Sequence, residues 1–206
     1  LICDDLTAAW DRLKALGVDI LLPFFVAFRT LRDRAALKEV AAAFMLAGAL
    51  LAAIAVFEFV KGWLLYASLE RALDVPWAMG SYLGRGEAIR ATASAGHPIV
   101  LGYLLVVALA CSIMLAPRIA APWMRWSLFA LLAMGLVVTV SRGPWLGAAL
   151  TLVVALGIGR GAWSRLGKLA GATLLIGGLV LVSPWGSTII DYLPFVGSVN
   201  AETIDY

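Results

Sequence analysis

The stretch LLAMGLVVTVSRGPWLGAALTLVVALGIG, residues 131–159, holds a single charged residue, Arg142, among apolar and small uncharged side chains. It lies in a run, residues 126–159, whose 34 residues are otherwise uncharged. As one α-helix the run would measure about 51 Å at ~1.5 Å per residue, whereas the hydrocarbon core of a bilayer is about 30 Å thick. The sequence therefore predicts two helices that are joined by a turn at SRG, residues 141–143. Gly143 allows a turn, and Pro144 suits the first turn of a new helix.

The composition predicts an integral membrane protein. Of 206 residues, 63% are hydrophobic and 14% are charged, and the mean hydropathy is +0.95. A soluble domain has about 45–50% apolar and about 25% charged residues. The net charge of +3 does not indicate nucleic-acid binding, because in a membrane protein the placement of Lys and Arg matters more than their sum. Two cysteines do not make a disulfide framework, and both are expected to be free.

Apolar runs that could cross a bilayer occur at six places, so we expect an all-α, polytopic transmembrane helical bundle that forms a single domain. A long outer loop, 61–97, separates the second and third runs, and residues 186–206 begin another loop. The chain starts with Leu1 rather than Met, and we expect it to be part of a longer protein. The expected spans are residues 13–28, 39–60, 98–116, 126–141, 144–159 and 169–185.

The charges between the runs support this topology. With a turn at Arg142, the segments 29–39, 117–125 and 160–168 lie on one side and carry nine of the sixteen Lys and Arg against two of the thirteen acids. The other side carries seven basic and eleven acidic residues. This is the positive-inside distribution, which places Arg142 and both termini on the extracytoplasmic side.

The outer loop has two halves of different character. WLLYASLERALDVPW, residues 63–77, places aromatic and leucine side chains at helical spacing, which predicts a helix lying in the membrane interface. GSYLGRGEAIRATASAGHPI, residues 80–99, is rich in glycine and small polar residues and contains Arg85 and Arg90. Together with Arg142, these arginines could form an anion site, because guanidinium groups suit phosphate oxygens. The alternative is a snorkelling arginine at a helix end, beside ordinary solvated loop arginines.

Three segments resemble the O-antigen ligase/O-antigen polymerase superfamily of bacterial inner-membrane glycosyltransferases. TVSRGPWLGAAL, residues 139–150, looks like the S-R-G-x-W-L-G signature of that family. AIRATASAGHPIVLGYLL, residues 88–105, is similar to the family stretch that precedes it. LPFVGSVNAETIDY, residues 193–206, resembles the start of the family's large periplasmic loop. Their order and spacing carry the resemblance, because each segment alone is mostly glycine, arginine and apolar residues.

The resemblance implies a metal-independent and cofactor-independent enzyme of the GT-C class in the bacterial inner membrane. Such enzymes transfer a glycan from an undecaprenyl-pyrophosphate carrier to a hydroxyl of lipid A core, a growing glycan or a protein at the periplasmic face. The lipid pyrophosphate leaving group needs positive charge beside it. Arg142 and Arg90 are the expected substrate-binding residues, and Arg85 is a weaker candidate.

The only histidine, His97, is not expected to be the catalytic base. Immediately before Pro98, it fits a polar residue at a helix start, although it could line the substrate site. The resemblance places the family's catalytic histidine in the large periplasmic loop, beyond residue 206, so the chain alone is expected to be inactive. Glu58, near the outer end of its span, is either a functional intramembrane acid or an interfacial residue.

Two other classes stay open. A transporter of an anionic solute or a lipid-linked substrate predicts polar residues at mid-span and helices broken at bilayer depth, of which Asp19 with Pro23 is the one example. A non-catalytic scaffold would leave the outer arginines without a role. Glycines within the spans are better explained by close helix packing, and they include Gly48, Gly102, Gly135, Gly147 and Gly177.

Overall fold

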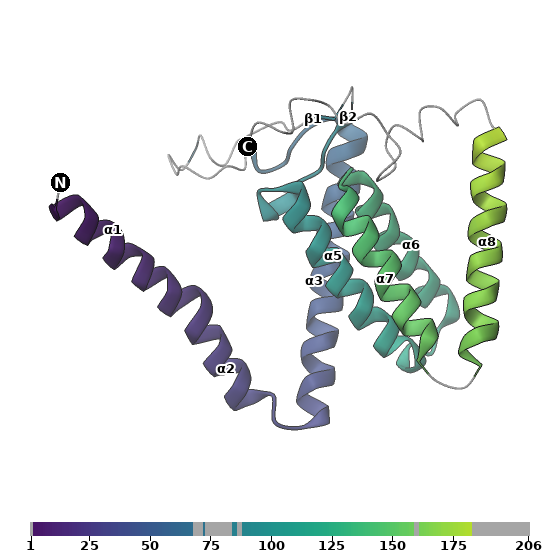
Figure 1. The fold of residues 1–206 in the computed structure, drawn as a ribbon, viewed down its shortest axis with the longest axis horizontal. Coiled ribbons are helices and arrows are strands. Elements are labelled where there is room, and N and C mark those ends of the chain that lie inside the picture. Colours follow the sequence, from purple (N-terminus) through teal and green to yellow (C-terminus); the bar gives the residue numbers. More distant parts are fainter. Residues whose placement is uncertain (1, 68–71, 73–83, 86–87, 159–160, 183–206) are drawn as a thin grey trace. The chain divides into compact units, whose positions relative to one another are not determined.

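A computed structural model describes residues 2–67, 72, 84–85, 88–158 and 161–182, and these residues are almost entirely helical (Figure 1). The one exception besides turns is an antiparallel pair of two-residue strands, β1 (Gly84–Arg85) and β2 (Ala88–Ile89). The all-α prediction is therefore confirmed. In chain order the helical segments are α1 (Ile2–Ala15), a π-helix (Leu16–Leu21), α2 (Leu22–Thr30), α3 (Arg34–Lys61), a 3-10 turn (Ala93–Ala95), α5 (Pro98–Leu115), a 3-10 turn (Ala116–Arg118), α6 (Pro122–Val138), α7 (Arg142–Gly157) and α8 (Ala162–Val182).

A helix occurs at each of the six places where a span is expected. Two of the described helices are long and apolar enough to cross a membrane: α3, with 28 residues, and α5 extended to Arg118, with 21. Helices α6 and α7 are apolar but shorter, at 17 and 16 residues. Length and composition thus favour association with a membrane.

The chain divides into two compact units, residues 1–43 and 44–206. In the first unit, the helix changes to π geometry just before Pro23, whose ring and missing N–H disturb the regular α pattern. Large apolar side chains along this helix are exposed, among them Phe24 and Phe28. The Asp33 carboxylate accepts a hydrogen bond from the Ala36 amide at 2.7 Å, which caps the first turn of α3.

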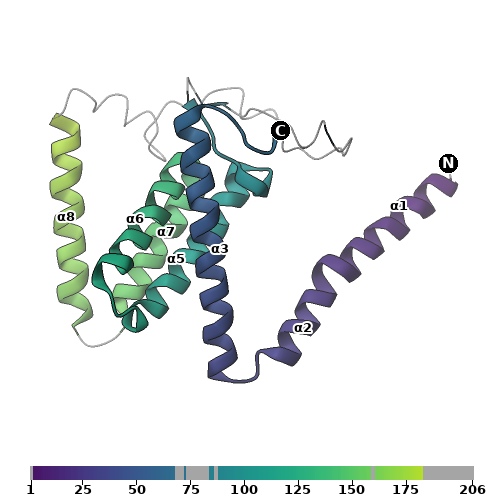
Figure 2. The same cartoon turned by 180° about the vertical axis from the view of Figure 1, so that it is seen from behind.

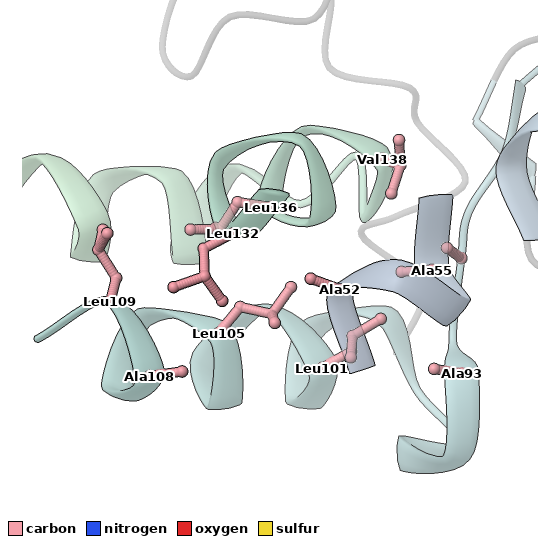
Figure 3. Close-up of a cluster of buried hydrophobic side chains, with 11 residues drawn as sticks. Ala52, Ala55, Ala93, Leu101, Leu105, Ala108, Leu109, Leu132, Leu136 and Val138 are labelled. Atoms are coloured by element: carbon pink, nitrogen blue, oxygen red, sulfur yellow. The ribbon is translucent and has the colours of Figure 1, made fainter. Parts of the chain in front are cut away.

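The second unit contains a bundle of α5, α6, α7 and residues 44–61 of α3, together with α8, which contacts α7 (Figures 1 and 2). Its buried core consists mainly of leucine and alanine, and Figure 3 shows how these side chains meet between the helices. Small alanines let the helix backbones approach, and the leucines fill the remaining space. The central residues are Ala52, Ala55, Leu101, Leu105, Ala108, Leu132 and Leu136.

Glycines lie where the helices cross. A Cβ at Gly135 of α6 would lie 2.7 Å from the Cβ of Ala52 in α3, and one at Gly102 of α5 would collide with the Pro144 ring of α7. Gly48 meets Ala108 in the same way, so close packing is confirmed for these three glycines. A Cβ at Gly147 would make only ordinary contacts, and the surroundings of Gly177 lie outside the described residues.

The long apolar run does break into two helices, but two residues earlier than predicted. Helix α6 ends at Val138 and α7 begins at Arg142, so the turn is 139–141 rather than 141–143. The first N–H groups of a helix have no partner within it, so Pro144 loses no hydrogen bond as the third residue of α7. The prediction was wrong because it placed Pro144 at the start of the helix.

The predicted interfacial helix is wrong in its first residues. Helix α3 ends at Lys61, Gly62 has a φ of 63°, and residues 63–64, of which Leu64 is buried, have no regular structure before a turn at 65–66. Most of the remaining predicted helix lies outside the described residues, as does the predicted loop 186–206.

Candidate functional site

The turn between α6 and α7 is tight and strained. Val140 has a φ of 47°, a left-handed conformation that a β-branched residue rarely adopts. Its amide donates to the carbonyl of Val137 at 3.0 Å. Such a conformation persists only where neighbouring contacts hold it, and it is found preferentially at functional sites.

Side chains from both helices close this turn. The indole Nε1 of Trp145 in α7 donates to the carbonyl oxygen of Leu136 in α6 at 2.8 Å, and the Thr139 hydroxyl donates to the same oxygen at 2.8 Å. The last carbonyls of a helix have no partner within it, so these two donors satisfy a group that would otherwise be exposed in an apolar setting. The Trp of the SRGPW motif therefore fastens the end of α6 to the beginning of α7.

Arg90 reaches this turn from a distant part of the sequence. Its Nε donates to the carbonyl of Thr139 at 3.2 Å, and its Nη2 donates to the hydroxyl of Ser141 at 2.7 Å. The neighbouring amide of Ala91 donates to the carbonyl of Val138 at 3.2 Å. The segment before α5 is thus joined to the end of α6 by a backbone hydrogen bond and to the turn by the Arg90 guanidinium.

Ser141 occupies the N-cap position of α7, but its hydroxyl does not cap the helix. It accepts from Arg90 and donates to the carbonyl of Thr139 at 3.1 Å. The next residue, Arg142, is the first of α7 and is half-buried. Two of the predicted arginines, Arg90 and Arg142, are therefore brought to the same turn.

The first turns of α5 and α7 lie against each other beside these arginines. Pro144 packs over Gly102, and a Cβ at Gly143 would lie 3.1 Å from the hydroxyl oxygen of Tyr103. A side chain at Gly143 would press on that hydroxyl. Glycine at this position allows the close approach of the two helices.

The segment that carries Arg90 also contacts a buried carboxylate, that of Glu58. Glu58 in the last two turns of α3 is fully buried and accepts three backbone N–H bonds. The donors are Leu65 at 3.0 Å, Thr92 at 3.1 Å and Ala93 at 2.8 Å. Glu58 thus ties the loop after α3 to the segment before α5, and its position relative to a membrane interface stays a prediction.

The other two predicted site residues are His97 and Arg85. His97 is exposed and is the N-cap of α5, where its Nδ1 accepts from the Ile99 amide at 3.2 Å. This is the structural role that its position before Pro98 indicates. Arg85 belongs to β1, where its Cα pairs with that of Ala88; its side chain lies outside the described atoms.

Sequence reasoning did not find the part that Glu58 plays. One signal was present: an acidic residue near the end of an otherwise apolar span needs partners. The partners themselves, backbone amides of residues 65, 92 and 93, have no signature in the sequence. Thr92 is also buried, and its Oγ1 has no hydrogen-bond partner among the described residues.

A metal site or a cavity among the other described residues would offer a second place for chemistry. No three His, Cys, Asp or Glu side chains among them lie close enough to hold a metal ion. An open cavity of about 490 Å³ in the first unit is lined by Phe24, Ala27, Phe28, Leu31 and Arg32, and none of these is a predicted site residue.

Comparison of the chain with protein-family models, curated proteins and solved structures gives no match. The likeness to the ligase and polymerase superfamily is therefore carried by the three sequence segments alone.

Proposed function

We propose that the chain is the transmembrane core of an inner-membrane glycosyltransferase of the O-antigen ligase or polymerase type. It crosses the membrane six times, in an arrangement like part of a GT-C enzyme. It binds an undecaprenyl-pyrophosphate-linked glycan with Arg142 and Arg90 at the periplasmic face and transfers the glycan to an acceptor hydroxyl of lipid A core or a growing glycan. Arg85 and His97 stay further candidates for lining the site.

The observation that carries this proposal is the contact between Arg90 and the turn that begins α7. The Arg90 guanidinium binds Ser141, the residue immediately before Arg142. Two cationic side chains are thereby associated with one turn, and a diphosphate carries enough oxygens to engage both. Partial burial strengthens such charge pairing, because water screens it less. Positive charge placed here would stabilise the diphosphate as it leaves.

The start of α7 adds to this positive potential. The N-terminus of a helix carries a partial positive charge and exposes backbone N–H groups, which favour phosphate. Because the Ser141 hydroxyl is bound to Arg90 and does not cap α7, no side chain at the N-cap occupies these N–H groups. The positive end of the α7 dipole therefore adds to the charge of the two guanidinium groups.

The positions of the other charges support the orientation. Arg118 and Arg125 flank the connection from α5 to α6, at the opposite end of these helices from Arg142. Basic residues at that end fit a cytoplasmic side. Large apolar side chains face outward from the bundle, as helices in lipid require, among them Val107, Val137 and Leu150.

The proposal is tested by assaying the complete gene product in proteoliposomes for glycan transfer from a polyprenyl-pyrophosphate donor. Lipid A core and growing glycan are supplied as separate acceptors, so the same assay distinguishes a ligase from a polymerase. Transfer to either acceptor supports the proposal. Absence of transfer, together with uptake of an anionic solute that depends on Arg142, would favour a transporter instead.

Cysteine labelling tests the orientation independently of activity. With Cys3 and Cys111 replaced by serine, a single cysteine at position 142 is expected to react with an impermeant maleimide added to the periplasmic side. A cysteine at position 120, in the exposed connection before α6, is expected to react only after the cytoplasmic side is opened. The reverse pattern would rule out the periplasmic site.

A further inference from the structure

Glu58 is an unusual acid for its surroundings. Its side chain is fully buried near the end of an apolar helix, and both carboxylate oxygens are engaged. Oε1 accepts from Leu65, just beyond α3, whereas Oε2 accepts from Thr92 and Ala93, just before α5. A buried carboxylate is costly unless its oxygens are hydrogen-bonded, and here the partners come from two separate loops.

A continuous path of contacts leads from this carboxylate to the arginine site. The amides of Thr92 and Ala93 bind Glu58, the adjacent amide of Ala91 binds Val138 at the end of α6, and the Arg90 side chain binds Thr139 and Ser141. Residues 90–93 therefore connect Glu58 to the turn that precedes Arg142. No other described acidic side chain accepts a hydrogen bond from this segment.

A strained backbone conformation occurs at each end of this path, at Ala93 beside Glu58 and at Val140 in the turn. Ala93 has a φ of 44° and Val140 a φ of 47°, and within the described part of the chain they are the two residues other than glycine with positive φ. A positive φ is unfavourable for a residue that carries a Cβ, so neighbouring contacts must hold it. The shortest bond to Glu58, at 2.8 Å, comes from the strained Ala93 itself. The carboxylate thus offsets the strain of the conformation that presents Arg90 to the turn.

We propose that Glu58 is a positioning residue of the arginine site: by fixing residues 92 and 93, it sets the place of Arg90 and, through Arg90, the conformation of the turn before Arg142. An amide cannot replace it, because glutamine has a single acceptor oxygen and its NH₂ would face a backbone donor. Glu58 touches no substrate in this role. Its effect on the turn is independent of the proposed function, whereas its effect on donor binding rests on that function.

Hydrogen exchange tests the effect on the turn without any activity. In the full-length protein in nanodiscs, Glu58→Gln is expected to speed exchange roughly fivefold or more both in residues 90–95 and in the turn 139–143. Glu39→Gln, which changes an exposed glutamate on the same helix, is the matched control and is expected to leave both segments unchanged. Unchanged exchange in the turn would overturn the proposal, because a merely local role would affect residues 90–95 alone.

A second pair of variants tests whether Arg90 carries the effect. Arg90→Gln by itself should speed exchange in the turn, and adding Glu58→Gln should then change the turn by less than about twofold. Fully additive effects would show that Glu58 acts on the turn by another route. If Glu58→Gln does not fold, Glu58→Asp replaces it in both experiments, since it keeps the charge but shortens the reach.

The consequence for catalysis is a change in donor affinity. If the proposed glycosyltransferase activity holds, Glu58→Gln should raise KM for the polyprenyl-pyrophosphate donor about tenfold and leave KM for the acceptor unchanged. An equal rise in both KM values would contradict a specific effect on the arginine site. Faster exchange in the turn in a protein without transferase activity would uphold the positioning role and refute the proposed function.

Discussion

The two ends of the α5–α6–α7 bundle both carry arginines, but among the described residues the hydrogen bonds by which Arg90 joins one element to another lie at one end. Arg90 holds the turn between α6 and α7 with two hydrogen bonds, and Arg142 begins α7 half-buried. At the other end, Arg118 is exposed, and the Arg125 guanidinium lies 6.0 Å from the ring centroid of its own neighbour, Trp126. Among the described residues, neither Arg118 nor Arg125 donates a hydrogen bond to another element.

An arginine at a helix end therefore has no fixed structural role. In the proposed orientation, the charges at the basic end need only face the cytoplasm, which any solvated arginine does. At the turn end, backbone carbonyls and a serine hydroxyl are arranged to receive a guanidinium. The organised end is where we place the diphosphate, and the following variants compare it with the basic end.

The largest expected effect is on catalysis. If the proposed transferase activity holds, Arg142→Ala in the full-length protein should lower kcat/KM for glycan transfer by about 100-fold or more, because a lost stabiliser of developing charge typically costs about 10²–10³ in rate. Arg125→Ala, at the basic end, should change it by less than about twofold. Equal losses in both variants, or normal transfer by Arg142→Ala at normal expression, would remove the distinction between the two ends.

A smaller effect is expected on stability. Gly102→Ala places a methyl group into the Pro144 ring at the turn end and should destabilise the fold by about 1–3 kcal/mol. Gly157→Ala, at the far end of α7, meets no atom within 4 Å and should be neutral or slightly stabilising. Unfolding in detergent measures both, and equal stability of the two variants would mean that α5 and α7 do not touch at Gly102.

A still smaller change in stability is expected from the hydrogen bond that joins the Trp145 indole to the end of α6. Trp145→Phe removes the donor to the Leu136 carbonyl and should cost about 1 kcal/mol of unfolding free energy. Trp163, which is 88% exposed in α8, provides the control, since Trp163→Phe loses no described hydrogen bond. A larger loss from the Trp163 variant would contradict the indole contact.

The smallest expected effect is an increase in stability rather than a loss. Ala93→Gly relieves the positive φ at the Glu58 contact and should stabilise the protein by roughly 0.5–1 kcal/mol, even though glycine is more flexible in the unfolded chain. Ala95→Gly, two residues later and without a positive φ, should destabilise it. Melting temperatures compare the two, and a lower value for Ala93→Gly would show that the strain is not significant.

Much of the local structure could be predicted from sequence. The long uncharged run around Arg142 had to break, because one helix of that length exceeds the bilayer, and it does break within two residues of the predicted place. Glycines at 48, 102 and 135 correctly indicated close packing. The interfacial helix beginning at Trp63 failed, because helical spacing of aromatic residues does not reveal that Gly62 turns the chain at the end of α3.

Neighbouring residues and composition are sufficient to specify the helices, the break between α6 and α7 and the unequal distribution of charge. The tertiary structure decided that Arg90 meets Ser141 and that Glu58 receives the amides of Thr92 and Ala93. These contacts join residues 34 to 51 positions apart, and backbone amides and carbonyls occur at almost every residue. Only the packing of the helices selects which of them a buried carboxylate or guanidinium meets.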